Sequence, residues 1–322
     1  MFGKMVGLLI SHNNNGYCCF ENEPLDCLHF LPSCATMMVM KQYPPIPNFV
    51  SKSPQRIAVR DIGSGVPIVV LAGGPAACGK IYWDSLEKIS ETNRLIFWDY
   101  RSCGQSDRRK PYSIESDLQD LKTVITELRL QSPILLGHSY GGMLALKYTI
   151  KNPEKIRGLI LVNTISSSEV YPESNLKKKR HLESLGLYEE WKKLGDLSAE
   201  GNASAMKQKR YWELELNNHL VDKSLIPKVL SGLEINFEAL VAMQPDLSEF
   251  DIKSDVNSVT QPVLITAGKK DIIVLDEPLK LHNLIPQSTL VSFSNSGHMP
   301  FVDENKNFLA TVETWLTERS FL

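Results

Sequence analysis

From residue 56 onward, short apolar runs alternate with segments in which apolar residues recur every three or four positions. The runs are typical of strands, most of them buried on both faces, and lie at 56–62, 66–74, 93–101, 132–139, 156–163, 261–268 and 288–294. The periodic segments predict helices at 118–128, 140–152, 275–284 and 308–316. Strands that alternate with helices predict an α/β fold, with a mostly parallel sheet flanked by helices.

The alternation stops between about residues 166 and 259, where Leu, Glu, Lys, Trp and Tyr recur at helical spacing. About ninety residues are too many for a plain connection between two strands. We therefore expect an inserted helical cap at 166–259, over a core domain formed by 51–165 and 260–322. The basic run "KKKR" at 177–180 is interpreted as the solvated face of a cap helix.

Residues 1–50 lack a sustained period and end in the proline-rich stretch "QYPPIPNFVSKSP", which indicates an atypical N-terminal extension and linker. One hypothesis is that the functional protein starts near Met38. The alternative is a cysteine-bearing tail with a role of its own. Cysteine spacing fits neither a zinc site nor a disulfide framework, which indicates free thiols and a cytoplasmic protein; the cysteines are Cys18, Cys19, Cys27, Cys34, Cys78 and Cys103.

Composition narrows the classes of partner. The chain is 43% hydrophobic and 22% charged, and its net charge is −2. This balance gives no basis for binding nucleic acid or an anionic membrane surface. The apolar runs are far shorter than the roughly 20 residues of a membrane helix. No cysteines are paired with suitably spaced histidines, so we expect no metal, and we expect no cofactor.

The segment "GHSYG" places Ser139 between two glycines, after a predicted buried strand and before a predicted helix. This is the G-x-S-x-G pattern in the strand–turn–helix context that a nucleophilic serine requires. The glycines permit a strained turn that side chains would crowd. We therefore predict that Ser139 is a nucleophile rather than an ordinary turn residue.

A serine nucleophile needs a base, and the base needs a group that fixes its tautomer. His298, between the last predicted strand and the last helix, is the candidate base. Asp271 follows a predicted strand and is the candidate acid; Asp276 competes with it but is placed to cap the next helix. The order Ser139, Asp271, His298 suits this strand–helix architecture.

The oxyanion of an acyl-transfer intermediate needs preorganised donors. The backbone N–H of Tyr140, at the start of a helix, is one candidate. The N–H of Gly74, in "LAGGPAACG", is the other, since Pro75 has none. The alternative for the second loop is a Gly-Pro turn without a catalytic role.

Taken together, these motifs resemble the α/β-hydrolase superfamily from about residue 56 to the C-terminus. Within it, "AGGPA", "FWDYRSCGQSD" and "SGHMPFVDE" are similar to the proline iminopeptidase branch. Asp99, Arg101 and Ser106 match a D-x-R-G-x-G-x-S segment, as do Cys103 and Gly104, and we expect this segment to be structural. Two departures from the branch are Ala72, in place of a histidine, and Ala76, in place of a glycine.

The resemblance implies a substrate with a free N-terminal, proline-like residue, whose amino group is held by cap glutamates. Glu213 and Glu234 are the candidates, and the alternative is that both are ordinary surface residues. The leading hypothesis is a serine hydrolase that forms an acyl-enzyme on small peptides or amides. A carboxylesterase or carbon–carbon bond hydrolase of the same fold is the alternative, and a ligand-binding receptor with little turnover is the alternative from another class.

Overall fold

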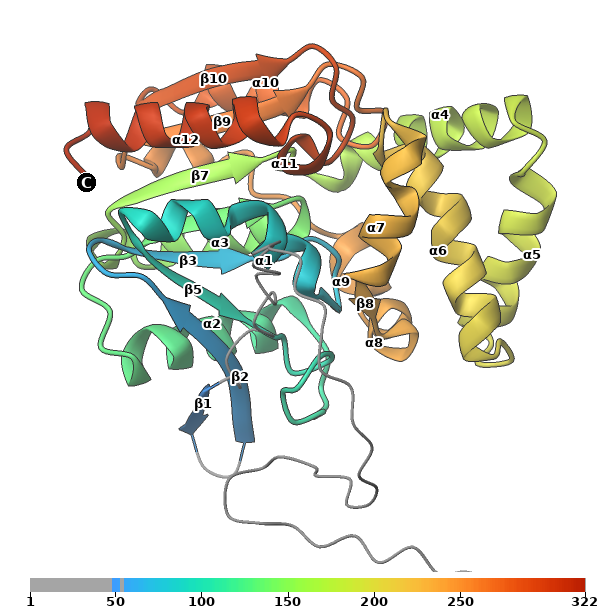
Figure 1. Cartoon of the computed structure of the whole chain (residues 1–322), viewed down its shortest axis with the longest axis horizontal. Helices are drawn as coiled ribbons and strands as arrows, with labels where there is room; N and C mark the ends of the chain where they lie inside the picture. The colour runs from blue at the N-terminus through green and yellow to red at the C-terminus, as the bar shows by residue number, and fades with distance from the viewer. Residues whose placement is uncertain (1–47, 53–54, 322) are drawn as a thin grey trace, which may run out of the picture. The chain divides into compact units, whose positions relative to one another are not determined.

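The computed structural model describes residues 48–52 and 55–321. Within them, eight strands form one sheet in the order β1-β2-β5-β3-β6-β7-β9-β10 (Figure 1). The β1/β2 and β2/β5 pairs are antiparallel and the others are parallel, which confirms the predicted mostly parallel sheet. The strands are β1 Asn48–Lys52, β2 Gln55–Ile62, β3 Pro67–Leu71, β5 Arg94–Trp98, β6 Ile134–His138, β7 Gly158–Val162, β9 Val263–Gly268 and β10 Ser288–Phe293.

The described residues cover only the end of the predicted N-terminal extension, residues 1–50. The sheet begins at Asn48, inside the stretch that the sequence assigns to a linker, because "NFVSK" pairs with the start of β2. The rest of the predicted extension, its cysteines and the hypothetical start near Met38 lie outside the described residues.

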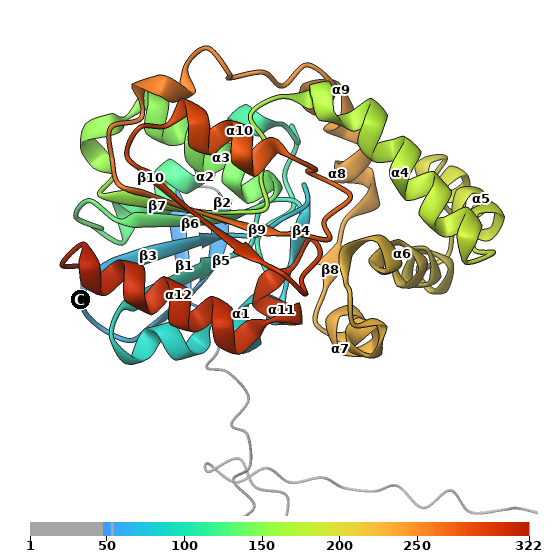
Figure 2. The ribbon, with the colours of Figure 1, turned by 90° about the horizontal axis from the view of Figure 1, so that it is seen from above.

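Central strands carry the core because their residues are apolar on both faces. Every residue of β6 and of β7 is buried. Figure 2 shows α1 and α12 on one face of the sheet, and α2, α3 and α10 on the other. The flanking helices are α1 Lys80–Leu86, α2 Ile114–Glu127, α3 Tyr140–Lys151, α10 Glu277–Leu284, α11 Pro300–Asp303 and α12 Asn305–Glu318.

Residues 166–259, between β7 and β9, form what we call the cap segment, and its helices lie together beside the sheet (Figures 1 and 2). They are α4 Tyr171–Ser184, α5 Tyr188–Ala199, α6 Ala205–His219, α7 Ile226–Ser231, α8 Phe237–Ala242 and α9 Gln244–Ser248. No helix among the described residues combines the length and the apolar character that a membrane span requires.

The cap segment is joined to the core by a short antiparallel ribbon. Its strand β8, Glu234–Ile235, pairs with β4, Ala77–Cys78, just after the glycine loop that follows β3. The backbone N–H of Asn236 also donates to the Ala76 carbonyl, at 3.0 Å. The cap is thus attached to the loop that the sequence nominates for oxyanion binding.

The interpretation of "KKKR" as a wholly solvated face is wrong at one position. Lys177 and Lys179 are about half exposed and pair with glutamates of their own helix. The Lys178 side chain is only 18% exposed and lies 2.7 Å from the buried carboxylate of Glu215 on α6. Helix packing, which a charge run does not reveal, turns this lysine inward.

Candidate active site

Ser139 occupies a strained turn between β6 and α3. Its backbone has φ 50° and ψ −116°, a conformation that costs a non-glycine residue on the order of 1–3 kcal/mol. Hydrogen bonds fix the turn: Ser139 N–H donates to the Val162 carbonyl at 2.9 Å, and the hydroxyl of Thr164 donates to the Ser139 carbonyl at 2.7 Å. The flanking glycines are required because Cβ atoms on Gly137 and Gly141 would lie 2.4 Å or less from backbone carbonyl oxygens.

His298 and Asp271, predicted from distant parts of the chain, lie side by side. The His298 Nδ1 and the Asp271 Oδ2 are 2.8 Å apart, and both side chains are buried. Because a carboxylate only accepts, Nδ1 carries the proton and Nε2 keeps its lone pair. Asp276 is instead exposed and pairs with Lys280, so the structure does not place it at the base.

The carboxylate of Asp271 has a donor at both oxygens. Asn163 Nδ2 donates to Oδ2 at 2.7 Å, beside His298, and the Ile273 backbone N–H donates to Oδ1 at 2.7 Å. Burial opposes ionisation of this group, but His298, Asn163 and the backbone donor outweigh it and hold the Asp271 pKa below its ordinary value. Asp271 is therefore an anion at neutral pH, suited to orient an imidazole.

Two other histidines contact His298 and bind its backbone. His138, next to Ser139, binds the His298 carbonyl through Nε2 at 2.9 Å, and the two rings are 4.8 Å apart. His219, at the end of α6 in the cap segment, accepts from the His298 backbone N–H at 2.7 Å, with its ring 5.1 Å away. No hydrogen bond joins Ser139 Oγ to His298 among the described residues. His138 is one link between the nucleophile turn and the base loop, and the Asn163–Thr164 segment, which binds the Gly297 and Ser139 carbonyls, is another.

The two candidate oxyanion donors are unoccupied by protein acceptors within the described residues. Neither the Gly74 nor the Tyr140 backbone N–H donates to another group there. Gly74 has φ 147°, in the region that favours glycine, and a Cβ on it would lie 3.0 Å from the Ala77 nitrogen. Neither N–H group is thus committed to an acceptor within the described part of the chain.

The two cap glutamates nominated by the sequence lie apart and have different partners. Glu213, on α6, pairs with Arg210 at 3.0 Å, and its side chain is 46% exposed. Glu234, on β8, accepts from the Gly104 backbone N–H at 3.2 Å and forms an ion pair with Arg108 at 3.6 Å; its side chain is 53% exposed. Only Glu234 is attached to the loop after β3, through the β4/β8 ribbon.

Sequence reasoning missed a second glutamate on α6, the helix that carries Glu213. Glu215 is buried between Lys178, at 2.7 Å, and His219, whose Nε2 is 3.5 Å away. Burial opposes its charge, but the Lys178 ammonium and His219 outweigh it and lower the Glu215 pKa to about 2. The available signal was the spacing of four between Glu215 and His219, which puts both on one face of α6.

The "DYRSCGQSD" segment makes the internal contacts expected of a structural loop. Asp99 Oδ2 accepts from the Gln105 backbone N–H at 2.9 Å, and the Ser106 hydroxyl donates to the Asp99 carbonyl at 2.6 Å. Gly104 has φ 60°, and a Cβ there would lie 2.2 Å from the Asp99 carboxylate. The segment holds its own shape beside β2 and β5.

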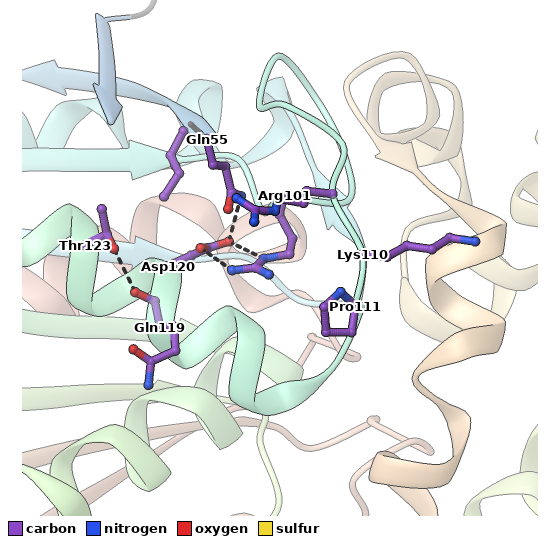
Figure 3. Close-up of a pocket in the computed structure, with 9 residues that line it drawn as sticks. Gln55, Arg101, Lys110, Pro111, Gln119, Asp120 and Thr123 are labelled. Carbon is purple, nitrogen blue, oxygen red and sulfur yellow. Dashed lines mark hydrogen bonds and ion pairs between the residues drawn. The ribbon is translucent and has the colours of Figure 1, made fainter. Parts of the chain in front are cut away.

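A pocket of about 300 Å³ lies beside this segment and α2, and holds none of the nominated site residues (Figure 3). Arg101 and Asp120 form a buried, bidentate ion pair in its wall, at 2.6 and 2.7 Å. Gln55 adds a hydrogen bond to Asp120 at 3.4 Å. This pair satisfies its own charges, which suits a structural wall better than a substrate site. The described residues contain no group of three or more His, Cys, Asp or Glu side chains placed to hold a metal ion.

Comparison with known proteins identifies the class. A family model described as the alpha/beta hydrolase fold matches residues 66–182. The AB hydrolase superfamily protein YisY of Bacillus subtilis is 30% identical over 264 residues, which cover 79% of this chain and 92% of that protein. The chain therefore has the α/β-hydrolase fold. It belongs to the α/β-hydrolase superfamily, as its motifs indicate.

Two further similarities bear on activity. A proline iminopeptidase of Clostridium botulinum is 27% identical over 286 residues, which cover 85% of this chain and 97% of that protein. A solved esterase from Exiguobacterium antarcticum superposes with a TM-score of 0.61 at 25% identity, covering 84% of this chain and 99% of the esterase. Together with the family, these relatives support a hydrolase activity.

Proposed function

We propose that this protein is a serine hydrolase in which Ser139, His298 and Asp271 form the catalytic triad. The observation that carries the proposal is the buried hydrogen bond between Asp271 and His298, in a loop tied by His138 to the strained turn of Ser139. These side chains supply a nucleophile, a base and an orienting anion, so the proposed reaction requires no metal and no cofactor.

In the proposed mechanism, the Ser139 hydroxyl attacks a carbonyl carbon while His298 Nε2 takes its proton. The imidazolium that forms is stabilised by Asp271, which accepts from Nδ1–H. His298 then protonates the leaving group, and an acyl-enzyme remains on Ser139. Water, activated by the same base, attacks the ester and releases the acid.

The proposed oxyanion hole consists of the Gly74 and Tyr140 backbone N–H groups. Supporting this, neither donates to another group within the described part of the chain. Tyr140 also stands at the N-terminus of α3, where the helix dipole favours developing negative charge. Loss of one such donor lowers kcat by about 10²–10³ in serine hydrolases.

For the substrate, we propose a small peptide or amide with a free, proline-like N-terminal residue, held under the cap segment. The similarity to a protein named proline iminopeptidase supports this choice. Of the two nominated cap glutamates, Glu234 is the better candidate to pair with the substrate ammonium, because β8 is bonded to the loop that carries Gly74. Glu213 pairs with Arg210 at 3.0 Å, whereas the Glu234 carboxylate lies farther from its own cationic neighbour, at 3.6 Å from Arg108.

An esterase is the second candidate function, and the similarity to the Exiguobacterium esterase favours it. Carbon–carbon bond hydrolysis and ligand binding with little turnover are further alternatives. In this proposal the cap segment determines which molecules reach Ser139, so the same core is compatible with each of them. A cytoplasmic location is proposed as well. It is supported by Cys78 and Cys103, which are buried free thiols of the kind found in reducing compartments.

The decisive experiment labels the protein with a fluorophosphonate probe. Wild-type protein should be labelled on Ser139, and Ser139→Ala should not be labelled. A panel of aminoacyl anilides and p-nitrophenyl esters then ranks the substrates, with prolyl anilide expected first. Absence of Ser139-dependent labelling would reject the serine mechanism, and a panel led by blocked esters would favour the esterase.

The role of Glu234 has its own test, with Glu213 as the matched control on the cap. Glu234→Gln should raise KM for free-amine anilides far more than for uncharged esters, because only the former lose an ion pair. Glu213→Gln should leave both KM values close to wild type. Equal effects of Glu234→Gln on both substrate types would remove this residue from the amine site.

A further inference from the structure

Two buried tyrosines hold the loop that follows β3, and the proposed mechanism does not use them. The peptide unit between Ala72 and Gly73 carries one carbonyl oxygen and one N–H. The Tyr100 hydroxyl donates to the Ala72 oxygen at 2.9 Å, and the Gly73 N–H donates to the Tyr82 hydroxyl at 2.7 Å. Both polar ends of a single peptide plane are thus fixed by tyrosine hydroxyls.

The directions of the hydrogen bonds made by Tyr82 follow from its second partner, His138. Tyr82 donates to His138 Nδ1 at 2.8 Å, and His138 donates through Nε2–H to the His298 carbonyl at 2.9 Å. The carbonyl can only accept, which assigns the His138 proton to Nε2 and makes Nδ1 an acceptor. Burial, and then the nearby His298, hold the His138 pKa well below its ordinary value, so the ring stays neutral.

Steric contacts leave this peptide little room to rotate. A Cβ on Gly73 would lie 2.6 Å from His138 Nδ1 and 3.0 Å from the Tyr82 hydroxyl. On the other side, a Cβ on Gly141 of α3 would lie 2.7 Å from the Ala72 oxygen. Tyr82 also stacks on Phe301 at 5.3 Å, and Tyr100 packs edge-on against Tyr140 at 5.9 Å.

We propose that Tyr82 and Tyr100 are positioning residues that orient the oxyanion loop, residues 72–74, toward the carbonyl attacked by Ser139. The inference rests on the proposed serine mechanism. The next peptide along the chain carries the Gly74 N–H, so rotation of the Ala72–Gly73 plane would turn that donor away. Ala72 has no polar side chain of its own, and the two tyrosines supply the restraint from α1 and from the loop after β5.

The test uses Tyr82→Phe and Tyr100→Phe, which remove one hydroxyl each and keep the ring packing. Tyr148→Phe is the control, because Tyr148 is a buried tyrosine about two turns along α3 from the nucleophile. Active sites are counted by fluorophosphonate labelling, and kcat and KM are measured with p-nitrophenyl acetate per labelled site. Inhibition by a trifluoromethyl ketone, whose adduct places an oxyanion beside Ser139, reports on the hole directly.

We expect each of the two variants to lower kcat by on the order of tenfold, less than the loss of a whole donor, with KM within about twofold of wild type. The inhibition constant of the ketone should rise by the same factor as kcat/KM falls. The acid limb of the pH–rate profile should keep its midpoint, because the His298–Asp271 pair is untouched. Tyr148→Phe should match wild type in every readout.

Other outcomes separate the possible failures. If the wild type is not labelled, the serine mechanism itself is rejected. If labelling is normal but Tyr82→Phe and Tyr100→Phe keep the wild-type kcat and ketone affinity, only the positioning role is overturned. A shifted acid limb with unchanged ketone affinity would also overturn it, since the effect would then act on the base. Should one variant fold poorly, the other tests the opposite end of the same peptide.

Discussion

At the scale of single residues, the site depends on side chains whose hydrogen-bonding capacity is already used. Asp271 accepts from Asn163 and His298 at one oxygen and from backbone N–H groups at the other. An amide at this position has one acceptor oxygen and one NH₂ group, so it would oppose a donor whichever way it turns. Charge and acceptor count are therefore both required at residue 271.

Asp271→Asn should consequently lower kcat/KM by on the order of 10³–10⁴, because His298 loses the partner that fixes its tautomer and stabilises its charged form. The variant should also unfold at a lower temperature, since a buried donor is left unpaired. Hydrolysis of p-nitrophenyl acetate and thermal melting measure the two effects. Asp276→Asn, in the same loop region but exposed and paired with Lys280, is the control. A comparable loss of activity in that control would contradict the assignment.

At the scale of elements, an ion pair with a buried carboxylate bridges α4 and α6 of the cap segment. Lys178 and Glu215 are 2.7 Å apart, and the carboxylate side chain is only 4% exposed. His219 connects this pair to the base, because its carbonyl accepts from the His298 backbone N–H. Cap packing and the geometry of the proposed active site are thereby coupled.

Lys178→Met should lower the free energy of unfolding by roughly 3 kcal/mol, because it leaves the Glu215 carboxylate buried without its cation. Lys177→Met, one residue away in the same basic run, removes only an exposed pair with Glu173 and should cost less than about 1 kcal/mol. Urea unfolding at pH 7 distinguishes them. Adding Glu215→Gln to Lys178→Met should recover part of the loss, and equal costs for the two lysine variants would contradict the buried pair.

The same elements show what the sequence can predict. Local periodicity is enough for the strands from β2 onward that are five residues or longer, but not for β1, which the sequence assigns to a linker, or for the two-residue β4 and β8. The G-x-S-x-G pattern nominates Ser139, with His298 and Asp271 at matching loop positions. The contacts of Lys178 with Glu215, of Tyr82 with His138, and of β4 with β8 join residues far apart in the chain. Helical spacing gives the face of a helix but not its neighbour, so these contacts needed the structure.

At the scale of the whole molecule, the interior contains a carboxyl group whose ionisation opposes folding. Asp117, on α2, is buried and accepts from the Tyr140 hydroxyl at 2.7 Å. Burial raises the Asp117 pKa to about 7, although the hydrogen bond from Tyr140 works against the shift. The negative charges of the neighbouring Asp120 and Asp246 also raise the Asp117 pKa. In the unfolded chain the same group titrates near its ordinary value of 3.8.

The folded state therefore binds this proton more tightly than the unfolded chain does. Below about pH 4 both states are protonated, and between pH 4 and pH 7 the wild type should lose stability as pH rises. Asp117→Asn keeps an acceptor for Tyr140 and carries no charge. The free energy of unfolding of the variant, minus that of the wild type, should therefore increase by roughly 2–3 kcal/mol from pH 5 to pH 8. Urea unfolding at several pH values across that range measures this difference. Titrating groups that the two proteins share contribute equally to both and cancel. Glu115→Gln is the control on the same helix. The Lys151 ammonium lowers the pKa of Glu115, and this ion pair is exposed. The free energy of unfolding of Glu115→Gln should therefore change with pH in parallel with that of the wild type. A parallel curve for Asp117→Asn as well would show that Asp117 is ionised in the folded protein at pH 5.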